Sequence, residues 1–123
     1  MSLNNAYQSG DWKGEKHVPV IHAPESIKSG EEVEIRISIG DGEAHPNTFE
    51  HYISWMKIYF QPEGHNFPIE IGTYDFAAHG ESEIFTEPNV TARFTAKKSG
   101  TITATSYCNI HGLWENTAEL KVD

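Results

Sequence analysis

The amino-acid sequence has little of several features that define common protein classes. Its 123 residues include one cysteine and two methionines, and 9 basic side chains stand against 18 acidic ones, giving a formal net charge of -9. A single cysteine excludes a disulfide within the chain. The excess of negative charge argues against nucleic acid or an anionic membrane as a partner. No stretch approaches the roughly 20 consecutive apolar residues of a membrane span. The polar N-terminal residues lack the apolar core of a secretory signal, so we expect a cytoplasmic protein.

The helical period of 3.6 residues is also missing, whereas the two-residue period of β-strands is clear. Apolar and polar side chains alternate over residues 33–39, 92–96 and 118–122, which predicts three strands with one buried face. The runs 52–60 and 101–107 are rich in aromatic and β-branched residues. Because 52–60 is apolar on both faces, we expect it to be a central strand covered on both sides.

Stretches rich in glycine, proline and asparagine separate the expected strands, notably at residues 40–47 and 61–68. Short strands at such intervals predict an all-β protein, an antiparallel β-sandwich. The chain length fits one domain over residues 1–123. Residues 1–16 would form an N-terminal arm that leads into a loop of the functional site.

Histidine, in contrast, is abundant, with seven in the chain. Cys108 and His111 form a Cys-x-x-His turn followed by Gly112, and this spacing lets a thiolate and an imidazole bind one ion. A buried cysteine that only fills space near an unrelated histidine explains the same turn about equally well. His45 and His51 flank a proline-containing loop that could direct both rings to one point, although most such pairs are ordinary surface residues.

With His17, these residues make a set of four histidines and one thiolate, all at expected strand ends. Structural zinc is usually four-coordinate, and magnesium and calcium prefer oxygen ligands. Blue copper is the serious competitor, but no methionine follows Cys108 to serve as its weak axial ligand; glutamine or a backbone oxygen could replace it. Five nitrogen and sulfur ligands with one open position favour iron that binds a small oxygen species.

Four stretches carry a resemblance to a known family. They are Gly10-Asp11-Trp12-Lys13-Gly14-Glu15-Lys16-His17-Val18-Pro19-Val20, then His45-Pro46-Asn47-Thr48 with Glu50-His51, then Ala78-His79-Gly80-Glu81-Ser82, and Ser106-Tyr107-Cys108-Asn109-Ile110-His111-Gly112-Leu113-Trp114. In this order, and over almost the whole chain, the sequence resembles the superoxide reductases. The resemblance is to their one-iron neelaredoxin type, which is related to the C-terminal domain of desulfoferrodoxin.

The resemblance implies an immunoglobulin-like sandwich of about seven strands and one mononuclear iron per chain. Its equatorial ligands would be His17, His45, His51 and His111, and Cys108 would be the axial thiolate. The implied reaction reduces superoxide to hydrogen peroxide with one electron and two protons and releases no oxygen. Rubredoxin or a similar small redox protein would donate the electron, and the chain would form a homo-oligomer, by resemblance a tetramer. A blue-copper-like electron carrier is the alternative function.

Glu15 and Lys16, the two residues that precede His17, complete the expected site. An acidic protein should repel a small anion, so the site needs a locally positive mouth, and Lys16 is the candidate for it and for ordering a water that delivers a proton. The resemblance implies that Glu15 binds the oxidised iron and withdraws on reduction. We interpret His79 as structural, and the Gly40–Ala44 segment matches no motif.

Overall fold

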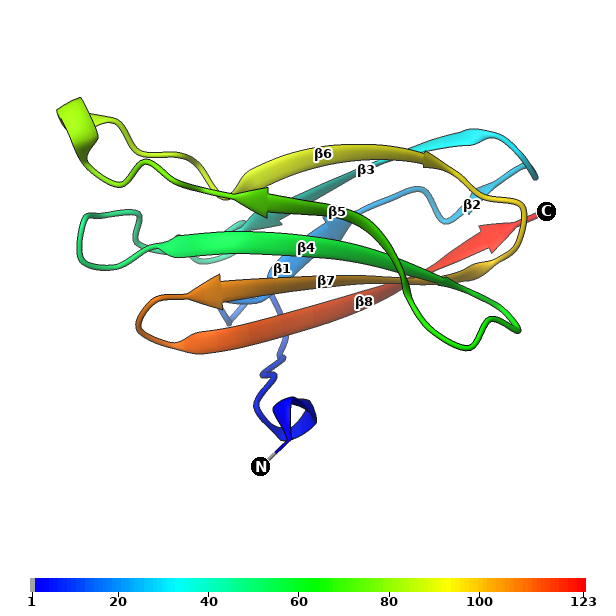
Figure 1. The fold of residues 1–123 in the computed structure, drawn as a ribbon, viewed down its shortest axis with the longest axis horizontal. Helices are drawn as coiled ribbons and strands as arrows, with labels where there is room; N and C mark the ends of the chain where they lie inside the picture. The colour runs from blue at the N-terminus through cyan, green and yellow to red at the C-terminus, as the bar shows by residue number, and fades with distance from the viewer. Residues whose placement is uncertain (1) are drawn as a thin grey trace.

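Two β-sheets face each other in this computed structural model, which describes residues 2–123 (Figure 1). One sheet has the strand order β1-β3-β6 and the other has the order β2-β8-β7-β4-β5. The strands are β1 (Pro19–His22), β2 (Ser26–Ile27), β3 (Glu32–Ile39), β4 (Ile53–Pro62), β5 (Ile69–Asp75), β6 (Asn89–Thr95), β7 (Gly100–Cys108) and β8 (Gly112–Val122). The described residues contain no α-helix, only the short 3-10 turns η1 (Leu3–Asn5) and η2 (Glu81–Glu83). The prediction of an all-β sandwich is confirmed.

The alternating segments form the core between the sheets. In β3, Val33, Ile35 and Ile37 are at most 1% exposed, and they point toward the other sheet, where Met56 and Ile58 of β4 are fully buried. Removing one such side chain from water contributes about 1.5–3 kcal/mol. The strands predicted at 33–39, 52–60, 92–96, 101–107 and 118–122 all lie within or overlap observed strands.

The expectation that strand 52–60 is covered on both sides is wrong. β4 lies between β7 and β5, and its inner face is buried while its outer face is only half-buried. No second layer of described residues packs on that outer face. Instead the large side chains cover one another: Trp55 stacks on Tyr107 with ring centroids 5.9 Å apart, and Lys57 Nζ lies 4.8 Å from the centre of the Trp55 ring.

Three strands had no clear sequence signal. β1 and β2 have four and two residues, too short to display a period, and β5 is an edge strand with no buried residue. β2 also pairs in parallel with β8, an exception to the antiparallel pairing predicted for the sandwich. These three segments form strands because they pair with neighbouring strands of the sheets, not because of a pattern in their own sequence.

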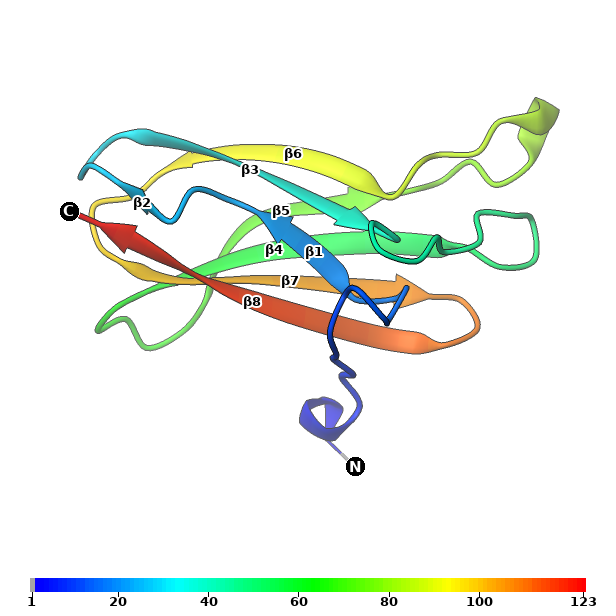
Figure 2. The ribbon, with the colours of Figure 1, turned by 180° about the vertical axis from the view of Figure 1, so that it is seen from behind.

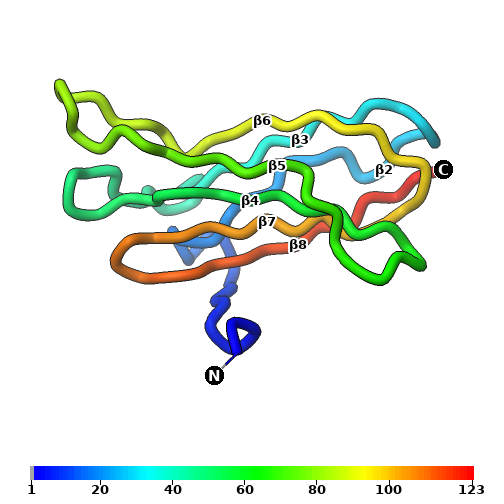
Figure 3. Tube along the Cα trace, in the orientation of Figure 1, coloured from blue at the N-terminus to red at the C-terminus, as the bar shows by residue number. Residues whose placement is uncertain are grey.

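The loops that matter for function extend from one end of the sandwich. At the left end in Figure 1, and at the right end when the molecule is seen from behind in Figure 2, lie the loop before β4, the β5–β6 connection and the β7–β8 turn. The N-terminal arm extends away from the sandwich at the edge formed by β8 (Figure 3), and within it Gln8 forms an isolated parallel bridge with Trp114. None of the helical turns in residues 2–123 is long and apolar enough to cross a membrane.

Candidate metal centre

Cys108 and His111 are placed by the tight turn between β7 and β8. Cys108 is the last residue of β7, fully buried, and it is paired across the hairpin with Gly112. Gly112 has a φ of +84°, a left-handed conformation that glycine adopts without steric cost. The turn directs the main-chain N–H of His111 to Cys108 Sγ at 3.3 Å. A hydrogen bond of this kind would withdraw charge from a thiolate.

His45 and His51 converge because the loop between them closes on itself. Thr48 Oγ1 accepts the N–H of His51 at 3.1 Å, and the N–H of Thr48 donates to the His51 carbonyl at 2.9 Å. These bonds fold residues 48–51 into a compact turn. The two imidazole rings then lie with their centroids 4.6 Å apart.

His17 enters from the loop just before β1. Its ring is buried and stacks on Trp114 of β8 with centroids 4.9 Å apart and an interplanar angle of 14°. Trp114 therefore packs against a candidate ligand. Gly42 allows the close approach of the neighbouring loop, since a Cβ there would lie 2.8 Å from the Trp12 carbonyl oxygen.

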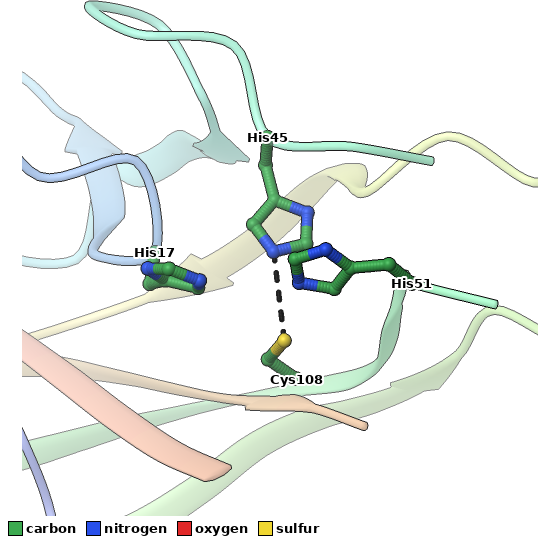
Figure 4. Close-up of side chains that lie close together, drawn as sticks. All are labelled: His17, His45, His51 and Cys108. Atoms are coloured by element: carbon green, nitrogen blue, oxygen red, sulfur yellow. Dashed lines mark hydrogen bonds between the residues drawn. The ribbon is translucent and has the colours of Figure 1, made fainter. Parts of the chain in front are cut away.

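Donor atoms of these residues converge on one point. One ligand atom from each of His17, His45, His51 and Cys108 lies within 4.8 Å of every other, and the side chains point toward one another in Figure 4. His111 joins this cluster through Nδ1, which is 3.0 Å from His17 Nε2 and 3.2 Å from His51 Nε2. The same His111 atom lies 3.7 Å from Cys108 Sγ, and His45 Nε2 lies 3.5 Å from that sulfur.

The outer nitrogens of two histidines are held by hydrogen bonds. Glu15 Oε1 accepts a hydrogen bond from His17 Nδ1 at 2.6 Å and another from the His17 main-chain N–H at 3.1 Å. His45 Nδ1 donates to the Pro46 carbonyl at 2.5 Å. A proton on each outer nitrogen leaves Nε2 unprotonated and facing the cluster, the tautomer that a metal requires.

Two imidazoles of the site, those of His45 and His51, have lowered pKa values. Burial lowers the pKa of His45 to about 4, and the nearby charges of His17, His51 and Lys16 act in the same direction. Burial also lowers the pKa of His51, followed by the charges of His111, His17 and Lys16. A metal ion competes with protons for these nitrogens, so a lowered pKa leaves them unprotonated and free to bind a metal at a lower pH.

Glu15 and Lys16 lie beside the cluster rather than within it. Burial tends to raise the pKa of Glu15, but the hydrogen bonds from His17 and the charges of His17 and Lys16 outweigh it, and the net pKa is lowered. The carboxylate is therefore ionised and bound to the outer side of His17. The positive charge of Lys16 makes the smallest contribution to the lowered pKa of His45 and of His51.

Residues that the sequence did not indicate also shape the site. Gln8, in the N-terminal arm, donates from Nε2 to the His111 carbonyl at 2.8 Å. Asn109 binds the main chain on both sides of His51. Neither has a sequence signal beyond its position, because both act through contacts between distant segments. His79, interpreted as structural, is buried and stacks on Tyr52 with centroids 3.6 Å apart.

Four imidazoles and one thiolate at the end of a β-sandwich define a class of proteins with a mononuclear metal bound by nitrogen and sulfur. The donors exclude magnesium and calcium, which bind oxygen. Five converging donors exceed the four of a structural zinc site. The cluster fits one mononuclear iron.

Comparison with known proteins narrows this class. The profile of the desulfoferrodoxin family matches residues 9–117. The superoxide reductase of Pyrococcus horikoshii is 49% identical, with 97% of this chain and 99% of that protein covered. The neelaredoxin of Megalodesulfovibrio gigas is 40% identical, with 95% of each covered. The solved structure of a Thermotoga maritima relative has a TM-score of 0.96 at 48% identity and covers 100% of this chain and 98% of that one.

The reduced neelaredoxin of Archaeoglobus fulgidus has a TM-score of 0.86 at 48% identity, covering 94% of this chain and 98% of that one. This chain belongs to the desulfoferrodoxin family, and within it to the one-iron superoxide reductases. The resemblance seen in the sequence is confirmed.

Proposed function

We propose that this protein is a superoxide reductase that converts superoxide, one electron and two protons into hydrogen peroxide without releasing oxygen. The observation that carries the proposal is the convergence of a buried thiolate with imidazole nitrogens from four histidines at one end of the sandwich. The full-length similarity to superoxide reductases supports the same activity. We also propose that residues 1–123 form one domain.

The proposed ligands are Nε2 of His17, His45 and His51, Nδ1 of His111 and Sγ of Cys108. Bound iron would supply the electron and an open position for a small oxygen species. A blue-copper electron carrier would use two histidines and the cysteine, and it would leave the remaining histidines of the cluster without a role. The ligand count favours iron.

Glu15 has two proposed roles. Its hydrogen bond to His17 Nδ1 fixes the orientation of that imidazole. We also propose it as a further ligand of the oxidised iron, for which the carboxylate would exchange its bond to His17 for one to the metal. The lowered pKa of Glu15 supports both roles, because an ionised carboxylate is needed for each.

Lys16 is proposed to attract the substrate anion and to order a proton-delivering water. Its charge acts on two of the candidate ligands. The whole chain has a formal net charge of -9, so a local positive group is needed for fast encounter with superoxide.

The electron donor is proposed to be rubredoxin or a similar small redox protein, and the assembly a homo-oligomer, by family resemblance a tetramer. Apolar side chains beside the proposed ligands support a contact surface: Phe49 is 72% exposed and Ile110 is 57% exposed. We propose a cytoplasmic location, because the reducing conditions of the cytoplasm keep a cysteine ligand in its thiol or thiolate form.

Product stoichiometry tests the proposal. Purified protein loaded with iron should contain one iron per chain and should form one peroxide for each superoxide consumed, with no oxygen at an oxygen electrode. A dismutase would release oxygen for half of the superoxide consumed. A protein that holds copper and leaves superoxide untouched would be the electron carrier instead.

A further inference from the structure

The side chain of Asn109, the residue after Cys108, binds the main chain on both sides of His51. Its Nδ2 donates to the Glu50 carbonyl at 2.9 Å, and its Oδ1 accepts the N–H of Tyr52 at 2.9 Å. The main-chain N–H of Asn109 adds a bond to the Tyr52 carbonyl at 3.2 Å. Three hydrogen bonds therefore join the Cys108–His111 turn to the segment that carries His51.

These bonds continue the pairing of two strands beyond the point where the strands end. The β4–β7 ladder begins at the pair Ile53 and Cys108, and its register shifts between Ile53 and Trp55. Before Ile53 the chain leaves the sheet and no regular ladder fixes it. Beyond that pair, the Asn109 contacts join the main chain on both sides of His51 to the turn that follows Cys108.

Only an amide side chain of this length makes both bonds. Asparagine offers two N–H donors and a carbonyl acceptor on one short side chain. Aspartate would keep the acceptor for the Tyr52 N–H but would face the Glu50 carbonyl with another oxygen. Asn109 is exposed, so its side-chain bonds are not needed to satisfy a buried group and contribute only modestly to global stability.

We propose that Asn109 is a positioning residue that sets His51 against Cys108 and His111, so that their donor atoms reach one metal ion. The proposal rests on the metal centre of the proposed function, but on no step of superoxide reduction. Its effect would reach the metal through His51, since neither amide atom of Asn109 contacts a donor atom of the cluster among the described residues.

The first experiment measures Co²⁺ binding to the full-length chain against a chelator and records the thiolate-to-cobalt absorption. We expect Asn109→Ala and Asn109→Asp to weaken Co²⁺ binding by about 10- to 100-fold, the usual cost of losing an outer partner of a ligand, and to shift that absorption. Unchanged affinity and absorption in both variants would overturn the proposal. If wild type itself failed to bind Co²⁺ through its thiolate, the metal centre would be in error instead.

Asn89→Asp is the matched control for charge. Asn89 lines a pocket together with His45, and its side chain makes no hydrogen bond within residues 2–123. This variant adds the same charge near the site and should bind Co²⁺ within about twofold of wild type. An equal loss in Asn89→Asp and Asn109→Asp would assign the effect to charge and overturn the positioning role for the amide.

A double-mutant cycle separates positioning from general destabilisation. If Asn109 acts through His51, Asn109→Ala should change the Co²⁺ affinity of the His51→Ala variant by less than about twofold. Losses that multiply would mean that Asn109 acts independently of His51, and would overturn the proposal. Thermal unfolding of the metal-free Asn109→Ala and His51→Ala variants shows whether each is folded. If Asn109→Ala is unfolded, Asn109→Asp takes its place in the cycle.

Discussion

Strand β7 begins at Gly100 and ends at Cys108, and the turn after Cys108 leads to Gly112, the first residue of β8; the two glycines serve different purposes. At Gly100 a Cβ would lie 2.3 Å from the Gln61 carbonyl oxygen, so glycine is required for the close packing of two strands. At the other end Gly112 is required by its positive φ in the turn that carries Cys108 and His111. The first end serves the stability of the sandwich and the second serves the geometry of the metal centre.

This difference predicts that changes at the two ends separate function from stability. The largest effect is expected for Cys108→Ser at the site end. Loss of the proposed thiolate ligand should lower reductase activity by more than about 100-fold, since even outer partners of ligands cost 10- to 100-fold. The thiolate-to-iron absorption should disappear, while circular dichroism should still report a β-sandwich. A variant that keeps both the absorption and the activity would contradict the axial-ligand role.

At the opposite end, Gly100→Ala should reduce stability without changing the centre. Forcing apart two paired strands costs about 1–3 kcal/mol, or roughly 4–12 °C in the melting temperature of a domain this size. Gly14→Ala is the control, because a Cβ at Gly14 would meet nothing within 4 Å. The iron absorption of the folded Gly100→Ala protein should match wild type; a shifted absorption would show that the two ends are coupled.

Acid should destabilise the metal-free protein through the site end. The pKa of His45 is lowered to about 4 in the folded chain, from an ordinary value of 6.5. Between these values the unfolded chain binds the proton more tightly, so stability is lost as the pH falls from about 6.5 toward 4. Allowing for the partial exposure of His45, the loss should be about 1–2 kcal/mol.

Urea unfolding from pH 7 to pH 4.5 measures this loss, and the window stops where carboxylates begin to titrate. The His45→Asn variant provides the comparison, because it lacks the titrating imidazole. If the free energy of unfolding depended on pH equally in the variant and the wild type, His45 would not be the cause of the acid destabilisation.

The smallest effect is expected for Lys16→Ala. Loss of one steering charge should slow the bimolecular reaction with superoxide by about two- to tenfold and weaken its dependence on salt. Stopped-flow or pulse-radiolysis rates at two ionic strengths would measure both. Lys98→Ala, in the turn before β7 at the opposite end, is the control and should leave the rate unchanged. A rate that Lys16→Ala does not alter would place the positive mouth on other groups.

Much of the fold could be predicted because strand periodicity is local. Val33 to Ile39 display their buried face within a few residues, and the sheets confirm it. The exposure of the outer face of β4 could not be predicted. A strand that is apolar on both faces does not reveal whether a second layer packs outside the sheet. Edge strands such as β5 lack a buried face, so their sequence gives no period to detect.

By itself the sequence determined the strand pattern, the Cys108 and His111 turn and, through family resemblance, the candidate ligand set. The strand pattern and the turn follow from spacing along the chain, whereas the ligand set follows from the motifs shared with the family. Only the tertiary structure decided that His17, 94 positions before His111, stacks on Trp114 and faces the cluster. It also decided that the Glu15 carboxylate binds the outer side of His17, that Gln8 holds the His111 carbonyl and that Asn109 brackets His51. The physical reason is that such contacts depend on how distant segments pack, which no local period records.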